Sequence, residues 1–320
     1  MKKDRVFFVI IMILLVINLI LTYQSIQNNK SLNKYIQKSE DYKRNDLLSP
    51  DITWRNAQGL INHREEYKLS YYHLKLNITR ILNQSSGYYG LYLEDLNTGA
   101  WIGLNERERF TPASLLKIPI MIMILKKVEN GELDLNQKVI LTHNDIDYDS
   151  GELYKKGVGY ELTIQELLIY LMKHSDNTAA KALIKFTDED DLDNAFIAAE
   201  LPPLSNITDI SPKEYSNILR LLYYSTYLKP YFSQLALSNM MDTEFNSQLP
   251  AKLSKDIKVA HKVGFNDELK IFHDCGIIYI PKNPYILCVM SKNSSLDESN
   301  KIISEISKGI YDFTQERMKE

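Results

Sequence analysis

The chain has 320 residues, which is enough for one large domain with a substantial core or for two small ones. Hydrophobic residues make up 44% and charged residues 25% of it, as in ordinary globular proteins. The 38 basic and 41 acidic residues give a net charge of −3, so no basic excess indicates binding to nucleic acid. No group of Cys and His residues has zinc-ligand spacing, and we expect neither a metal nor a cofactor.

The amino-terminal segment departs from this average. Residues 6–23 are almost entirely apolar, with Asn18 in their interior, and approach the length of a helix that spans a bilayer. A cleaved signal peptide would have a shorter apolar stretch and a small-residue cleavage site, which is not evident here. We therefore predict an uncleaved signal anchor in the cell membrane. The basic residues Lys2, Lys3 and Arg5 precede the anchor. By the positive-inside rule, the tail of residues 1–5 is therefore cytoplasmic, and the chain that follows the anchor is extracytoplasmic.

The segment after the anchor differs from the remainder of the chain. Residues 24–68 are rich in Asn, Lys, Gln, Ser and Glu and show little sustained periodicity, which predicts a polar stalk or linker. From residue 69 onward the sequence has the patterns of a globular domain, which we expect to extend to residue 320.

The expected elements of this domain begin with a helix, because Leu74, Ile78 and Leu82 recur at helical spacing. Two strand-like runs follow, joined by a turn at Asn97–Gly99. A mainly helical stretch separates them from three further strand candidates, "KVAHKVGF", "KIFHDCGIIYI" and "PYILCVMSK". The closing helix has an apolar stripe made of Ile302, Ile303, Ile306, Ile310 and Phe313.

This order of elements predicts an α+β fold. Strands from both ends of the domain can form one antiparallel sheet, with the terminal helices on one face and the helical middle packed elsewhere. Fold class alone does not give the function.

The two cysteines, Cys275 and Cys288, flank a predicted hairpin with its turn at Lys282–Pro284. A cross-strand disulfide is possible, and an extracytoplasmic compartment would permit one. We favour two free thiols buried in the sheet core, where cysteine behaves as a small hydrophobic residue.

A serine and a lysine stand three residues apart in "ASLLKIPIMIMILKKVENGEL". Pro119 fits only the first turn of a helix, so the helix must begin near Ser114 and end before Gly131. Ser114 and Lys117 then lie on one face, at the positive end of the helix dipole. Lys117 can deprotonate Ser114 only if burial and nearby cations lower its pKa. The alternative is a serine N-cap followed by an exposed lysine.

A second polar cluster, Ser175-Asp176-Asn177, interrupts two apolar helical segments. The helix before it opens with a capping box at Thr163–Glu166. A tight turn of small polar residues suits a cleft, in which Ser175 would relay a proton to a leaving group and Asn177 would donate a hydrogen bond to a substrate amide. The alternative is a C-cap followed by an N-cap.

The third cluster is Lys262-Val263-Gly264, within an apolar, strand-forming run. A lysine is unusual in a core strand, and the glycine allows a ligand to approach the backbone closely. The alternative is an edge-strand lysine that deters aggregation.

Together and in this order, "SLLK", "SDN" and "KVG" resemble the Ser-x-x-Lys, Ser-Asp-Asn and Lys-Thr-Gly motifs of the class A β-lactamase-like and penicillin-binding serine hydrolase superfamily. The resemblance covers residues 69–320, and the expected order of elements agrees with it. It implies a β-lactamase/transpeptidase-like fold, in which terminal helices flank a five-stranded antiparallel sheet and the middle of the chain forms an all-helical subdomain.

The resemblance also implies the acid–base chemistry. Ser114 would be the acyl-accepting nucleophile, and Lys117 would be its base or the partner of that base. Ser175 and Lys262 would form the proton relay and the anion-attracting side of the cleft.

Substrate binding is implied in the same way. Asn177 would orient the substrate beside the strand residues Val263 and Gly264. The oxyanion hole would consist of the backbone N–H groups of Ser114 and Phe265.

A Ser-His-Asp triad is the competing serine chemistry. No G-x-S-x-G elbow is present, and the histidines follow no recognisable pattern. His174 and His261 lie beside two of the motifs, and we interpret both as packing residues.

The sequence departs from the superfamily pattern at two points. Val263 replaces the threonine whose hydroxyl helps to bind a substrate carboxylate in that superfamily. The Glu-x-x-Leu-Asn motif, which supplies the deacylating base of class A β-lactamases, is not found. Glu200 is the nearest acid, and we interpret it as a surface carboxylate at a helix end. Acylation of Ser114 is therefore supported, whereas fast deacylation is not.

We hypothesise a membrane-anchored, extracytoplasmic serine hydrolase that acts through acyl-Ser114 on a cell-wall (peptidoglycan) peptide or a β-lactam, with slow deacylation. One alternative is a true class A β-lactamase with an unrecognised base. Another is a catalytically dead module that binds peptidoglycan or a protein, although a dead cleft would not need the retained polar residues.

Overall fold

The computed structural model describes residues 64–203 and 208–317. The predicted tail, the membrane anchor at 6–23 and most of the stalk lie outside the described residues. Helix α3 (Arg64–Leu82) begins ahead of the domain boundary that was expected at residue 69. Within the described ranges, no helix combines the length and apolar character needed to cross a membrane.

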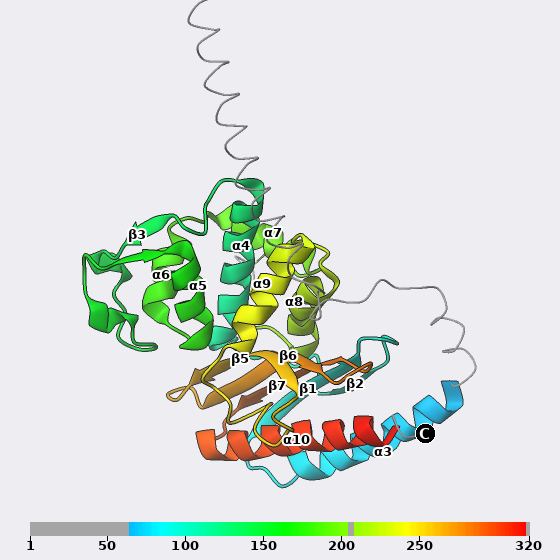
Figure 1. Ribbon diagram of the computed structural model, residues 1–320. Helices are drawn as coiled ribbons and strands as arrows, with labels where there is room; N and C mark the ends of the chain where they lie inside the picture. The colour runs from blue at the N-terminus through cyan, green and yellow to red at the C-terminus, as the bar shows by residue number, and fades with distance from the viewer. Residues whose placement is uncertain (1–63, 204–207, 318–320) are drawn as a thin grey trace, which may run out of the picture.

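A five-stranded sheet forms the middle layer of the domain (Figure 1), and its strand order is β2-β1-β7-β6-β5. Every neighbouring pair is antiparallel, so the predicted sheet is confirmed. The strands are β1 (Tyr88–Asp95), β2 (Trp101–Leu104), β5 (Lys258–Asn266), β6 (Ile271–Tyr279) and β7 (Tyr285–Lys292).

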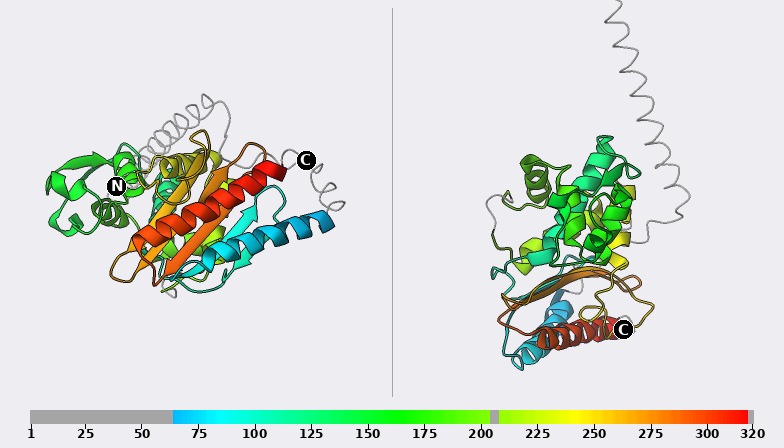
Figure 2. Two further views of the ribbon diagram at one scale, coloured as in Figure 1. Left: turned by 90° about the horizontal axis from the view of Figure 1, so that it is seen from below. Right: turned by 90° about the vertical axis from the view of Figure 1, so that its left-hand side faces the viewer.

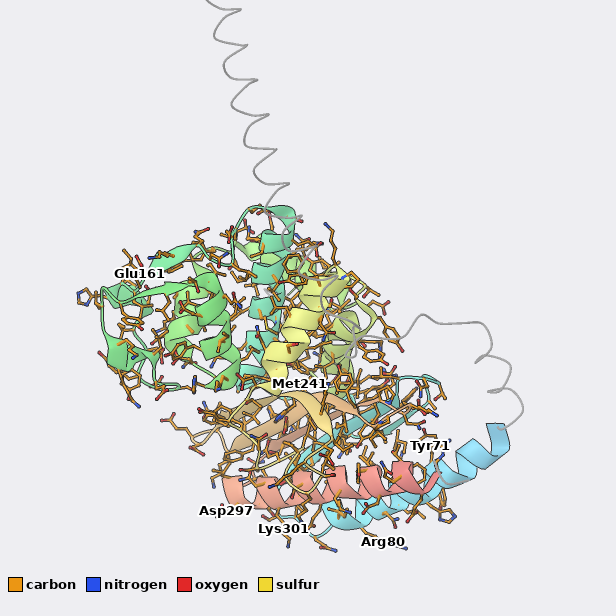
Figure 3. The ribbon with its side chains drawn as sticks, in the orientation of Figure 1. Tyr71, Arg80, Glu161, Met241, Asp297 and Lys301 are labelled. Carbon is orange, nitrogen blue, oxygen red and sulfur yellow. A yellow bond between two sulfur atoms is a disulfide. The ribbon has the colours of Figure 1, made fainter. Side chains whose placement is uncertain are left out.

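The terminal helices α3 and α10 (Leu296–Arg317) run side by side across one face of this sheet (Figures 1 and 2). The predicted isoleucine stripe of α10 is buried against the sheet. Charged side chains of the same two helices, Arg80, Asp297 and Lys301, project outward from this layer (Figure 3). The layer is thus amphipathic, as the period of its apolar residues predicts.

The other face of the sheet carries the middle of the chain (Figure 1). Its helices are α4 (Lys117–Asn130), α5 (Ile164–Lys173), α6 (Asn177–Ile184), α7 (Glu189–Ala198), α8 (Pro212–Tyr224) and α9 (Pro230–Met241). The prediction of an all-helical subdomain is wrong, because β3 (Lys138–Ile140) and β4 (Glu161–Thr163) form a second, two-stranded sheet. Each of these strands buries a single residue, Val139 or Leu162, and so leaves no periodic signal in the sequence.

Alternation along the strands separates two cores. On β5, Ala260 packs in the core beneath the helical layer, whereas Val259 packs in the core beneath α3 and α10. Lys262 shares the face of Ala260, and Val263 shares the face of Val259. The two sides of the Lys-Val-Gly motif therefore meet different environments.

The two cysteines form a disulfide, so the prediction of free thiols is wrong. Cys275 on β6 lies directly opposite Cys288 on β7 in the strand register. Directly opposed residues of antiparallel strands have neighbouring Cβ atoms, which places their sulfur atoms within bonding reach.

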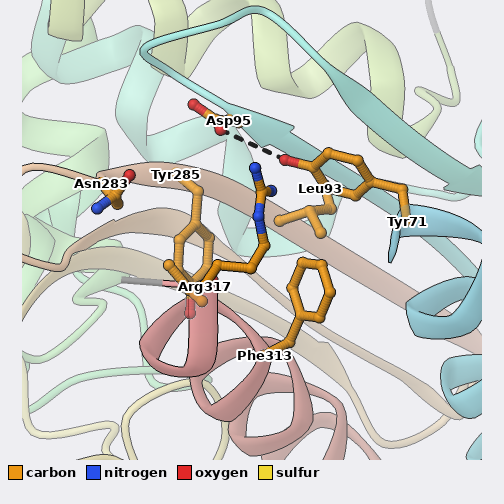
Figure 4. Close-up of a pocket in the computed structure, with 8 residues that line it drawn as sticks. Tyr71, Leu93, Asp95, Asn283, Tyr285, Phe313 and Arg317 are labelled. Carbon is orange, nitrogen blue, oxygen red and sulfur yellow. Dashed lines mark hydrogen bonds between the residues drawn. The ribbon is translucent and has the colours of Figure 1, made fainter. Parts of the chain in front are cut away.

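A pocket of about 150 Å³ lies where α3 and α10 meet the end of the sheet (Figure 4). The Tyr71 hydroxyl donates a hydrogen bond to Asp95 at 3.3 Å, and the guanidinium of Arg317 lies 5.2 Å from the centroid of the Tyr71 ring. This pocket contains none of the residues of the three motifs, so the candidate site lies elsewhere.

Candidate functional site

The first motif begins where the chain enters the helical layer. Ala113 has a left-handed backbone (φ 49°) and opens a short 3₁₀ helix, η1 (Ala113–Leu116), which runs directly into α4. Pro112 occupies the N-cap position of η1 without a side-chain hydrogen bond, so Ser114 does not cap the helix. Lys117 is only 5% exposed, which excludes the alternative of a solvated lysine.

Lys117 is surrounded by oxygen atoms from the first two motifs. Its Nζ lies 3.1 Å from Ser114 Oγ, 3.2 Å from Ser175 Oγ and 2.7 Å from Asn177 Oδ1. It also donates to the backbone carbonyl of Ser175. All of these oxygens are uncharged, so no carboxylate within hydrogen-bonding distance holds Lys117 in its protonated form.

Burial lowers the pKa of Lys117 to about 8, although the charges of Asp176 and Asp147 oppose this shift. A neutral lysine has two N–H donors and one lone pair. The Ser175 carbonyl and Asn177 Oδ1 can only accept, so they engage the two N–H groups. The lone pair then remains for the hydroxyl of Ser114 or Ser175, as a general base requires.

The second motif forms the turn between α5 and α6. Ser175 is fully buried and has a left-handed backbone (φ 51°). Asp176 caps α6 through Ala179 N at 2.9 Å, and its other oxygen accepts the backbone N–H groups of Glu152 and Leu153 at 2.7 Å. Asp176 therefore fixes the shape of the turn, and Ser175 and Asn177 on either side of it reach Lys117.

The third motif lies on β5, at the edge of the sheet. Lys262 is 1% exposed, so it is not a solvated guard against aggregation. Its Nζ donates to Ser175 Oγ at 2.8 Å and to the Val263 carbonyl at 3.1 Å. Burial, followed by the charge of Lys117, holds the pKa of Lys262 well below its usual range, against the opposing charge of Asp274. Ser175 Oγ thus bridges the two lysines.

The backbone of β5 offers a hydrogen-bond donor next to this cluster. Phe272 on β6 directs its N–H to Ser291 Oγ on β7, at 3.1 Å. Because Phe272 faces away from β5, its partner Phe265 is at a non-hydrogen-bonded position and directs its N–H to the free edge of the sheet. A Cβ on Gly264 would lie 2.8 Å from the Pro112 carbonyl, so only glycine lets the turn that carries Ser114 pack against β5.

Asn177 is more occupied than the sequence indicates. Its Oδ1 accepts from Lys117, and its Nδ2 donates to Asp147 Oδ1 at 3.1 Å. Asp147 also forms an ion pair with Lys181 at 2.8 Å. One Nδ2 hydrogen of Asn177 remains for a substrate. Sequence reasoning missed Asp147, which lies in an acidic loop without a motif.

The two histidines beside the motifs make other contacts. His261 is buried and pairs through Nδ1 with Asp274 at 2.8 Å, and His174 pairs with Glu244 at 3.0 Å. Neither hydrogen-bonds to Ser114. Among the described residues, no three His, Cys, Asp or Glu side chains are grouped so that they could hold a metal ion.

A sequence model of the beta-lactamase enzyme family matches residues 73–314. The chain belongs to this family. Its relatives include β-lactamase VEB-1 of Pseudomonas aeruginosa, which is 26% identical over 275 residues that cover 75% of this chain and 90% of VEB-1. The D-alanyl-D-alanine carboxypeptidase DacF of Bacillus subtilis is 28% identical over 82 residues, which cover 26% of this chain and 21% of DacF.

Solved structures agree with this membership. PBP-A superposes with a TM-score of 0.69 at 23% identity, over 76% of this chain and 96% of that chain. An ancestral class A β-lactamase superposes with a TM-score of 0.67 at 23% identity, over 75% and 99%. These likenesses confirm the predicted β-lactamase/transpeptidase-like fold. Through its family, the chain is a serine hydrolase that acts by acyl transfer.

Proposed function

We propose that this β-lactamase-family protein is a membrane-anchored, extracytoplasmic enzyme that acts through an acyl-Ser114 intermediate. The observation that carries the proposal is the position of Lys117 Nζ. This amine is buried, its pKa is lowered to about 8, and it lies 3.1 Å from Ser114 Oγ. Such a group can deprotonate a serine at a pH near neutrality.

The acylation step follows from these contacts. Ser114 Oγ bonds to the carbonyl carbon of an amide or ester while its proton passes to Lys117 Nζ. The backbone N–H groups of Ser114 and Phe265 stabilise the oxyanion. When the bond to the leaving nitrogen or oxygen breaks, that atom takes a proton from Ser175 Oγ, and Lys117 returns its proton to Ser175 across 3.2 Å. Lys262 donates to the same Ser175 oxygen and holds it in place.

Among the described residues, no carboxylate near the three motifs is a comparable base for deacylation. The Asp176 carboxylate is engaged by three backbone N–H groups, and Asp147 is paired with Asn177 and Lys181. Glu200 is exposed at the end of α7, as predicted, and residues 204–207 have the sequence Leu-Ser-Asn-Ile, which contains no acid. The absence of a positioned general base slows hydrolysis by about 10²–10⁴-fold. The acyl-enzyme should therefore persist.

The substrate that fits this behaviour is a cell-wall peptide, with β-lactams as slowly released acylating agents. PBP-A, which shares the fold, has been solved as a variant in an acyl-enzyme complex with penicillin G. The proposed location rests on the sequence, in which the apolar segment 6–23 follows a basic tail.

The test uses the full-length protein in detergent, incubated with a fluorescent penicillin and followed by intact mass. We expect a lasting adduct on the wild type and on Ser254→Ala, which removes an exposed hydroxyl outside the site. We expect no adduct on Ser114→Ala. An adduct on Ser114→Ala would refute the assignment of the nucleophile. Rapid turnover of a chromogenic cephalosporin without an adduct would favour the β-lactamase alternative.

A further inference from the structure

A cavity of about 210 Å³ adjoins the strand that carries the third motif. It lies at the free edge of the sheet, between β5, the chain that leads into β5 and the start of α10. Five of its lining side chains are apolar, namely Phe245, Val263, Phe265, Phe272 and Leu296. A substrate held by the Phe265 N–H would therefore place one of its substituents beside this cavity.

Within residues 64–203 and 208–317, no cationic residue lines the cavity. The only acidic lining side chain is Asp267, and neither Arg nor Lys contributes to the lining. His273 also lines it, but its Nδ1 accepts the Ser291 N–H and its Nε2 bonds to the Thr111 carbonyl, both at 3.0 Å. The ring is thus a neutral tautomer without a free donor.

Two further observations argue against an anion. Lys262 is not among the lining residues: its Nζ donates to Ser175 Oγ and to the Val263 carbonyl, although it lies 5.5 Å from the centroid of the ring of Phe245, which does line the cavity. Gln248, another lining residue, has a buried Oε1 with no hydrogen-bond partner among the described residues. A carboxylate oxygen would repel this acceptor, whereas an N–H or an apolar group would not.

We propose that this cavity binds an uncharged, apolar substituent of the acyl donor, so that the enzyme prefers substrates that are neutral beside Val263. This inference rests on the proposed acyl-Ser114 chemistry. Apolar contact with the phenylalanine rings stabilises a hydrocarbon group by about 25 cal/mol for each Å² removed from water. A carboxylate in the same place would lose its hydration without gaining a cation.

The test compares benzylpenicillin with its methyl ester, because the carboxyl group that the superfamily's threonine binds, at the position of Val263, is charged in the acid and uncharged in the ester. Acylation of the full-length protein is followed by intact mass, and each second-order rate constant is divided by the rate constant for hydrolysis of that compound by hydroxide. We expect the methyl ester to react about tenfold faster, the effect of one uncompensated buried charge or hydrogen bond. A ratio of ester to acid at or below one would overturn the inference.

A matched pair of variants locates the effect. Leu296→Arg places a cation at the cavity, where the leucine is 49% exposed, and should lower the ratio of ester to acid about tenfold. Ile140→Arg adds the same charge at a residue that is 56% exposed on β3, and should leave the ratio unchanged. An unchanged ratio in Leu296→Arg would refute the cavity as the binding site.

Labelling with p-nitrophenyl acetate separates this inference from the proposed function. The probe is small and neutral, so it should acylate Ser114 whatever the cavity binds. If Ser114 is labelled but benzylpenicillin reacts faster than its methyl ester, only the inference about the cavity is overturned. If none of the three probes labels Ser114, the proposed function fails and the inference fails with it.

Discussion

The pKa of Lys117 predicts how the acylation rate depends on pH. With a pKa of about 8, about one lysine in a hundred is neutral at pH 6 and about nine in ten are neutral at pH 9. Because only the neutral amine accepts the Ser114 proton, the acylation rate should rise about 100-fold between these values and then level off. A solvated lysine, with a pKa near 10.5, would still give a rising rate at pH 9.

The assay is single-turnover acylation by a fluorescent penicillin, stopped by quenching at set times from pH 6 to pH 10. Asp147→Asn tests the electrostatic cause, because the Asp147 charge favours protonated Lys117. Its removal should move the midpoint to lower pH, while the amide keeps the shape of the side chain. Asp149→Asn changes an exposed residue of the same loop and should leave the midpoint in place.

Three results would refute this reasoning. A midpoint near 10.5 would mean that burial does not lower the pKa of Lys117. A rate independent of pH would mean that no group titrates during proton removal. An upward shift in Asp147→Asn would contradict the expected sign of the Coulombic interaction.

Two other predictions concern stability and are measured by urea unfolding. Asp176→Ala removes a buried acceptor of three backbone N–H groups and should lower the free energy of unfolding by about 3 kcal/mol. The control is Asp188→Ala, which removes an exposed N-cap on α7 and should lower the free energy of unfolding by about 1 kcal/mol. Replacement of both Cys275 and Cys288 by serine should lower the free energy of unfolding by about 1–3 kcal/mol, because the disulfide links residues 13 apart in the sequence. An unchanged free energy of unfolding would show that strand pairing alone holds these two residues together.

Local patterns in the sequence predicted the elements that depend on local forces. The capping box of Thr163 and Glu166 opens α5 as expected, and Gly131 ends α4 with φ 79°. The turn at Asn97–Gly99 is likewise present, with Gly99 at φ 69°. These features are confirmed because each depends on a few neighbouring residues.

Features that depend on strand register or on contacts between distant segments could not be predicted from short sequence patterns. The disulfide requires Cys275 and Cys288 to be directly opposed, and a shift of one residue would have placed them on opposite faces of the sheet. Asp147 reaches Asn177 only because a loop folds back onto α6. The cavity beside Val263 combines side chains from four separate segments, so the valine substitution alone did not reveal an apolar site.

The two buried lysines indicate that the site is maintained at a cost in stability. Unfolding exposes Lys117, and its pKa then rises from about 8 to its ordinary value. Between these two pKa values the unfolded chain binds more protons than the folded chain. The free energy of unfolding therefore increases with pH across this range. The corresponding loss at neutral pH is about 3 kcal/mol. A module that only bound peptidoglycan would gain stability by replacing Lys117 with an apolar residue. Its retention next to Ser114, with both N–H groups engaged and its lone pair available to a hydroxyl, is therefore best explained by acyl transfer.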